Sequence, residues 1–131
     1  MGRRKSLTFT EVELEFMQVI WKAGEVSTDH ILEVLKERGR HLTDGSIRKI
    51  LSILVEKGHL TRRRDGRAFL YKPTAQKGQA DRTMVQDLLK RAFDGSASLM
   101  VAALFDSKNI KEQDLEAIKN LIAKHEKEEQ Q

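Results

Sequence analysis

The chain has 131 residues, a formal net charge of +4 and no cysteine, and its length suits one compact domain or two very small ones. The absence of cysteine excludes disulfides, zinc–cysteine sites and thiol catalysis. No apolar run approaches the ~20 residues of a membrane span, and no apolar segment follows the basic N-terminus, so we expect no membrane insertion, no signal peptide and a cytoplasmic protein.

The N-terminal half carries the patterns of three helices. Each pattern starts after a hydroxyl side chain that suits an N-cap, namely Thr10, Ser27 and Thr43. Each is followed by a glycine that suits a helix end, namely Gly24, Gly39 and Gly58. The third pattern also has an apolar stripe at helical spacing, made of Ile47, Ile50, Leu51, Leu54 and Val55. We therefore expect three helices, each between its cap and its glycine.

Residues 60–72, which read LTRRRDGRAFLYK, predict a basic β-hairpin. Two β-prone runs flank Asp65-Gly66, a dipeptide that supplies the positive φ angles of a two-residue turn, and Pro73 ends the second run. The tip is crowded by Arg62, Arg63, Arg64 and Arg67. Clustered like charges repel, so folding alone explains them poorly, whereas a bound polyanion explains them well. We expect Phe69 and Tyr71 of the return strand to pack onto the third helix.

The C-terminal part predicts three further helices. Residues 74–83 are polar and suggest a short junction, after which a helix with a broad apolar face runs from about Met84 to Phe93. A nearly all-apolar helix is expected over Ser96–Phe105, and an amphipathic one over about Glu112–Glu128. Three such helices cannot enclose a generous core by themselves, so we expect a two-fold dimer to cover them. The expected dimer interface consists of Leu88, Leu89, Phe93, Leu99, Met100, Ala103, Leu104, Leu115, Ile118 and Ile122.

Three helices followed by a basic hairpin are the element order of a winged helix-turn-helix. On the third helix, Ser46, Lys49 and Ser52 lie opposite the apolar stripe and Arg48 flanks them. Small polar side chains on an exposed helix face allow close approach to the major groove of B-DNA. The hairpin arginines would then reach adjacent phosphates or the minor groove. The residues expected to contact double-stranded DNA are Thr43, Ser46, Arg48, Lys49, Ser52, Arg62, Arg63, Arg64 and Arg67.

We therefore expect a mainly α fold with a small β-hairpin wing. Residues 1–74 would form a winged helix-turn-helix DNA-binding domain, and residues 75–131 a three-helix dimerisation domain. The charge distribution agrees with this division, because the basic excess lies in residues 1–75 and residues 76–131 are slightly acidic.

With these residues in place, the chain resembles the penicillinase-repressor family of bacterial transcription regulators, which includes BlaI, MecI and CopY. The resemblance covers about residues 7–122 and rests on the order and spacing of LTFTEVELEFMQVIWKAGEVS, SIRKILSILVEKGHL, GRAFLYKP and LLKRAFDGSASLMVAALF. It implies a homodimeric repressor whose winged helices bind the half-sites of a palindromic operator. By the motif match, the family reads DNA at Ser46, Arg48 and Lys49. Its wing positions are Arg63, Arg64 and Arg67.

The sequence departs from the family pattern at positions that bear on specificity and regulation. Ser52 and Ile53 replace the family's usual Asn and Arg, so a different base preference is expected. The copper-responsive branch carries a C-terminal cysteine cluster, and its absence here excludes that kind of sensing. The antibiotic-responsive branch is cut by a membrane sensor protease at an Asn-Phe bond in the short helix. The matching residues 101–105 read VAALF and contain no Asn-Phe bond. The resemblance still implies a regulatory membrane protease as a partner, but the sequence does not match its cleavage site.

The sequence leaves three alternatives to DNA binding: an enzyme, a protein-interaction module and an RNA-binding protein. The four histidines fall on different predicted elements without ligand spacing, and no Ser/His/Asp set, P-loop or metal motif stands out. We therefore expect no enzymatic activity, no cofactor and no metal. A winged helix can also serve as a protein-interaction module, although such modules usually lack a basic wing. RNA binding is a further alternative. Salt-dependent binding to duplex DNA, in competition with structured RNA, separates these functions.

Overall fold

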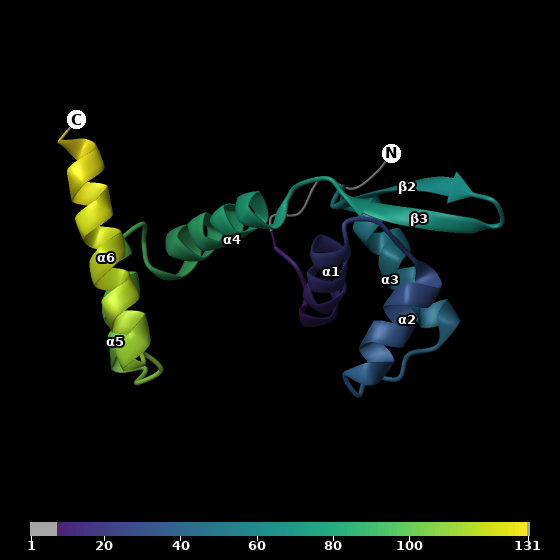
Figure 1. Cartoon of the computed structure of the whole chain (residues 1–131), viewed down its shortest axis with the longest axis horizontal. Coiled ribbons are helices and arrows are strands. Elements are labelled where there is room, and N and C mark those ends of the chain that lie inside the picture. The colour runs from purple at the N-terminus through teal and green to yellow at the C-terminus, as the bar shows by residue number, and fades with distance from the viewer. Residues whose placement is uncertain (1–7, 131) are drawn as a thin grey trace. The chain divides into compact units, whose positions relative to one another are not determined.

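Three helices and a β-hairpin form where the sequence predicts them in the computed structural model, which describes residues 8–130 (Figure 1). Three further helices follow, and the chain divides into two compact units between Asp87 and Leu88. The helices are α1 (Glu11–Ala23), α2 (Thr28–Glu37), α3 (Asp44–Glu56), α4 (Lys77–Ala92), α5 (Ala97–Asp106) and α6 (Glu112–Glu129). The predicted fold class, mainly α with a small antiparallel sheet, is therefore confirmed.

The predicted caps start the first three helices. Thr10 Oγ1 accepts a hydrogen bond from the Glu13 N–H at 3.1 Å, and the Glu13 carboxylate accepts one from the Thr10 N–H at 2.8 Å, which together form a capping box. Ser27 and Thr43 accept hydrogen bonds from the backbone N–H three residues further on, at 3.3 and 3.1 Å. The first helix ends at Gly24, whose φ of 91° would strain a residue with a Cβ atom.

The sheet has three antiparallel strands in the order β1-β3-β2, which are β1 (Val26–Ser27), β2 (Leu60–Asp65) and β3 (Ala68–Pro73). The sequence analysis did not predict β1, a two-residue strand that pairs with Leu70 and Tyr71. The expected turn at Asp65-Gly66 is also wrong by one residue. Asp65 pairs with Ala68, so Gly66 and Arg67 form the turn. The positive φ angle of the turn, 63°, is taken by Gly66 and not by Asp65, and glycine adopts such an angle without strain.

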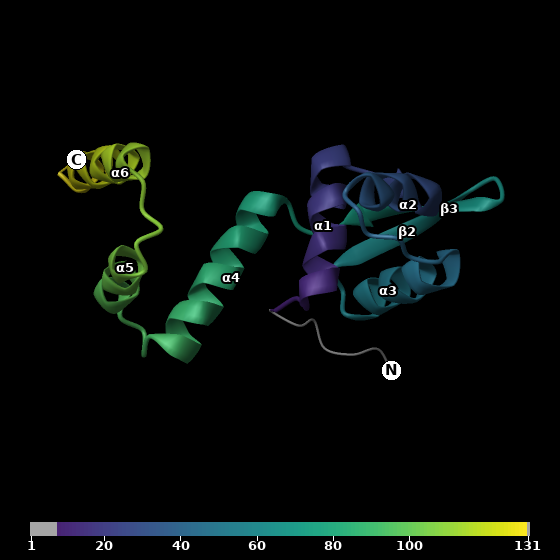
Figure 2. The ribbon, with the colours of Figure 1, turned by 90° about the horizontal axis from the view of Figure 1, so that it is seen from below.

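The core of the first unit lies between α1, α2, α3 and the base of the hairpin. Its fully buried side chains are Phe16, Met17, Ile20, Ile31, Leu35, Ile47, Leu51, Leu54 and Leu60. Tyr71 also belongs to this core, as expected, but Phe69 does not and stays 37% exposed. The expectation that both aromatic residues pack inward therefore holds only for Tyr71. Figures 1 and 2 show the tip of the hairpin extending beyond the three helices.

A partly buried ion pair joins the start of α1 to the end of α3. Lys57 Nζ lies 3.0 and 2.8 Å from the two carboxylate oxygens of Glu13, whose side chain is 7% exposed. Burial raises the pKa of Glu13, but hydrogen bonds from Lys57 and from the Thr10 N–H, together with the charge of Lys57, outweigh it. The pKa of Glu13 therefore lies below its ordinary value of 4.5.

This ion pair predicts acid sensitivity. The pKa of Glu13 is lower in the folded than in the unfolded chain. The pair therefore stabilises the fold at pH values above the pKa of the unfolded chain, and this stabilisation is lost as the pH falls through the pKa of the folded chain. Replacing Glu13→Gln should lower the free energy of unfolding by about 1–2 kcal/mol at neutral pH. In the Glu13→Gln protein, the free energy of unfolding should also decrease less steeply between about pH 5 and pH 3 than in the wild type. Urea unfolding at several pH values measures both. Equal pH slopes for the two proteins would contradict this assignment.

The helix α4 begins earlier than the sequence predicts. Residues 77–83, expected as part of a polar junction, form the first two turns of this helix. Lys77 Nζ lies 2.8 Å from the Asp81 carboxylate one turn further on. Such a pair stabilises a helix and needs no apolar side chain. Polar residues suit a helix as well as a loop, so the polarity of residues 77–83 does not by itself indicate a junction. No helix within residues 8–130 is long and apolar enough to cross a membrane.

The second unit contains the end of α4 together with α5 and α6. Ser96 caps α5 as predicted, its Oγ accepting a hydrogen bond from the Leu99 N–H at 3.2 Å. No side chain within residues 88–130 is buried, although many of these side chains are apolar. The large apolar side chains left exposed in this unit are Leu88, Leu99, Val101, Leu104, Phe105, Leu121 and Ile122. The unit therefore lacks a core of its own within the described chain.

Candidate nucleic-acid interface

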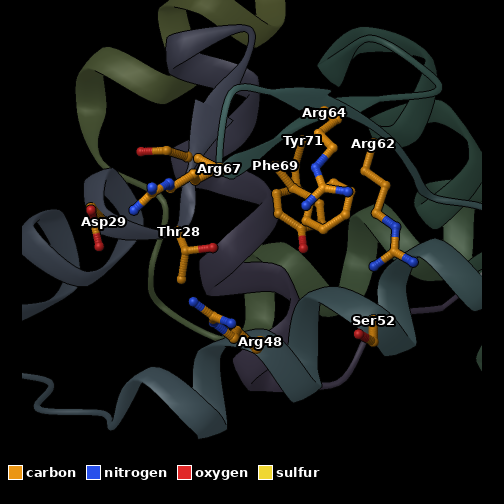
Figure 3. A pocket seen from close by; sticks show the side chains of 11 residues that line it. Thr28, Asp29, Arg48, Ser52, Arg62, Arg64, Arg67, Phe69 and Tyr71 are labelled. Atoms are coloured by element: carbon orange, nitrogen blue, oxygen red, sulfur yellow. The ribbon is translucent and has the colours of Figure 1, made fainter.

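A hollow of about 550 Å³ lies between the start of α2, the outer face of α3 and the hairpin (Figure 3). We call it the basic hollow. Its lining consists of Ser27, Thr28, Asp29, Arg48, Ser52, Arg62, Arg64, Arg67, Ala68, Phe69 and Tyr71. One arginine comes from α3 and the other three from the hairpin, so elements that are distant in the sequence converge here. Four guanidinium groups around one concave surface favour an anionic ligand.

The strand register decides which hairpin arginines face the basic hollow. Side chains alternate between the two faces of a sheet. The face of β2 and β3 that buries Leu60 and Tyr71 at the base carries Arg62 and Arg64 nearer the tip. Arg62 pairs with Tyr71 and Arg64 pairs with Phe69. Both arginines therefore lie on the helix side of the hairpin.

Arg63 occupies the opposite face of the hairpin and does not line the basic hollow. Its Nε and Nη2 donate hydrogen bonds of 3.0 and 2.9 Å to the two carboxylate oxygens of Glu25, in the segment between α1 and β1. The hydrogen bonds from Arg63, and then its charge, lower the pKa of Glu25 against the opposing effect of burial. The same contacts raise the pKa of Arg63. This bidentate pair ties the hairpin to the body of the unit.

The predicted α3 residues fall into two groups. Arg48 and Ser52 line the basic hollow, and the Arg48 Nε forms an exposed ion pair of 2.8 Å with Asp44. An exposed pair of this kind is weak, so Arg48 can exchange Asp44 for another anion. The other predicted residues on this helix lie outside the hollow but are exposed to solvent, namely Thr43, Ser46 and Lys49. The Thr43 side chain is already engaged as the cap of α3.

Two contributions to the site were not predicted from the sequence. The start of α2 brings Thr28 and Asp29 to the rim of the basic hollow. Phe69 lies among the arginines, with its ring centroid 4.8 Å from the Arg62 Cζ and 5.6 Å from the Arg64 Cζ. The period-two alternation of the strand could have separated Arg63 from its neighbours. The place of Asp29 depends on how α2 packs, for which the sequence holds no local signal.

The arrangement suits the binding of a ligand that carries phosphate groups. Guanidinium groups form bidentate hydrogen bonds with phosphate and do not act as bases at neutral pH. Among residues 8–130, no group of three or more histidines or acidic residues is placed to hold a metal ion. A convex helix face beside a basic hairpin offers one surface for a groove and another for a phosphate backbone.

Comparisons with known proteins agree with this geometry. The model of the penicillinase repressor family matches residues 9–124. The penicillinase repressor of Bacillus licheniformis is 26% identical over 124 residues, which cover 93% of this chain and 94% of that protein. The methicillin resistance regulatory protein MecI of Staphylococcus aureus is 20% identical over 120 residues, covering 92% and 97%. The solution structure of the DNA-binding domain of the repressor BlaI matches with a TM-score of 0.51 and 29% identity, over 57% of this chain and 90% of that domain.

Proposed function

The chain belongs to the penicillinase repressor family, and on this premise we propose that it is a transcriptional repressor that binds a palindromic DNA operator as a homodimer. The observation that carries the proposal is the basic hollow, where Arg48 of α3 and three hairpin arginines converge beside an exposed helix face. A helix of this kind enters the major groove, and a basic hairpin beside it contacts the flanking backbone. The similarity to the BlaI DNA-binding domain supports the same assignment.

Within this proposal, the residues have different tasks. Ser46, Lys49 and Ser52 would face base edges from α3. Arg48 would reach a base or a phosphate from the side of the helix, and Thr43 would contact DNA from its N-terminus. Arg62, Arg64 and Arg67 would contact phosphates from the hairpin. Arg63 lies on the opposite face of the hairpin and donates two hydrogen bonds to Glu25, so we assign it to holding the hairpin in place.

We propose that residues 75–131 hold the dimer and that residues 1–74 bind DNA. Leu99 is 56% and Leu104 49% exposed in the single chain, a state that costs free energy unless a partner covers them. A second copy related by two-fold symmetry presents the same apolar surface and covers both at once. Two winged helices related in this way match a palindromic operator. Cleavage of α5 by a regulatory membrane protease stays a prediction from the family resemblance.

Binding to duplex DNA tests the proposal directly. The full chain should retard a short mixed-sequence duplex at low salt, and the logarithm of its affinity should fall linearly with the logarithm of the salt concentration. Structured RNA of equal length should compete weakly. The protein-interaction alternative gains if no duplex is bound at about 50 mM salt, and the RNA alternative gains if RNA displaces the duplex at equal concentration. Fluorescence anisotropy with a labelled duplex measures both.

A further inference from the structure

Phe69 stands out because it is an exposed aromatic residue enclosed by charges. It lies on β3 directly opposite Arg64, and Arg62 is its diagonal neighbour on β2. The Arg64 and Arg62 guanidinium carbons are 5.6 and 4.8 Å from the ring centroid, both close enough for a cation–π contact (Figure 3). The ring is 37% exposed and does not belong to the buried core of the first unit. The ring therefore contacts the two arginines at the surface of the unit, outside its core.

The ring counteracts the repulsion between the two arginines. Two guanidinium groups on neighbouring positions of one strand face would diverge into solvent, since like charges repel and long side chains have many rotamers. The negative face of an aromatic ring attracts both groups and supports their aliphatic stems. Both charges are then held at the rim of the basic hollow, and fewer rotamers are lost when a ligand binds.

We propose that Phe69 is a positioning residue that preorganises Arg62 and Arg64 for two phosphates of the DNA backbone. The inference rests on the proposed DNA-binding function and deepens it. Phe69 itself acts through the arginines and makes no direct contribution to DNA contact. The number of phosphate contacts therefore stays the same without the ring, and only the cost of making them increases.

Replacing Phe69→Leu tests this role, because leucine keeps an apolar side chain but has no π face. Affinity for a short mixed-sequence duplex should fall about fivefold at every salt concentration, while the salt slope stays that of the wild type. Phe69→Tyr and Phe69→Trp should restore affinity to within about twofold, since both rings bind cations. The side-chain NMR resonances of Arg62 and Arg64 should be shifted upfield by the ring in the wild type and should lose that shift in Phe69→Leu.

A double-mutant cycle separates positioning from direct contact. In the Arg62→Gln/Arg64→Gln background, the further change Phe69→Leu should have no effect on affinity, because the groups that the ring positions are gone. A persistent fivefold loss in that background would overturn the inference and show that Phe69 touches DNA. Wild-type affinity in Phe69→Leu would overturn it as well. Failure of the wild type to bind duplex at low salt would instead overturn the proposed function, while the ring-current shifts would still report the stack.

Discussion

Replacing Arg62→Gln and Arg64→Gln together is expected to lower the affinity for duplex DNA on the order of 50-fold at about 0.1 M salt. Each guanidinium that neutralises a phosphate releases a counterion, so the salt slope should fall by about two units when both are lost. Both side chains line the basic hollow. Anisotropy titrations between about 50 and 200 mM salt give affinity and slope together.

The matched control is Arg63→Gln, which removes the same charge from the same strand. Arg63 lies on the other face of the hairpin and is held by Glu25, so its loss should change the salt slope by less than half a unit. A modest loss of affinity is still expected, since the hairpin is then less firmly held. If Arg63→Gln lowered the salt slope by a full unit, DNA would have to contact the opposite face of the hairpin as well, and the assignment of Arg63 to holding the hairpin would be wrong.

The second large effect is expected from Leu104→Glu in α5. Leu104 is 49% exposed in the single chain and belongs to the surface that we assign to the dimer. A carboxylate buried in an apolar interface without a partner is strongly unfavourable, so the dissociation constant of the dimer should rise on the order of 100-fold or more. Sedimentation velocity at several protein concentrations measures it. Operator affinity should fall with the dimer, because one half-site alone provides half of the contacts.

Ser98→Glu serves as the control for this charge. It introduces the same carboxylate into the same helix, about 120° around the axis from Leu104 and away from the predicted interface. The Ser98→Glu protein should remain dimeric at concentrations where Leu104→Glu is monomeric. An intact dimer in Leu104→Glu would show that the subunits associate through another surface, and a monomeric wild type would refute the proposed dimer altogether.

The helices of the first unit could be predicted because their signals are local. Thr10, Ser27 and Thr43 each accept a hydrogen bond from a backbone N–H only three residues away, and the glycine after α1 takes a positive φ angle. These features depend on neighbouring residues and need no tertiary contact. The start of α4 could not be predicted because polar residues suit a helix and a loop alike, although the ion pair of Lys77 with Asp81 favours the helix.

The sequence by itself determined the kinds of residue at the candidate site: a capped helix with a polar face, followed by a hairpin with four arginines. Tertiary structure decided which of them act together. Pairing of Asp65 with Ala68 moved the turn to Gly66-Arg67 and placed Arg64 opposite Phe69. Arg63 was turned toward Glu25, 38 residues earlier in the chain. Composition and caps depend on local sequence, whereas strand register depends on burying Leu60 and Tyr71 against distant helices, and that burial assigns each arginine to its face.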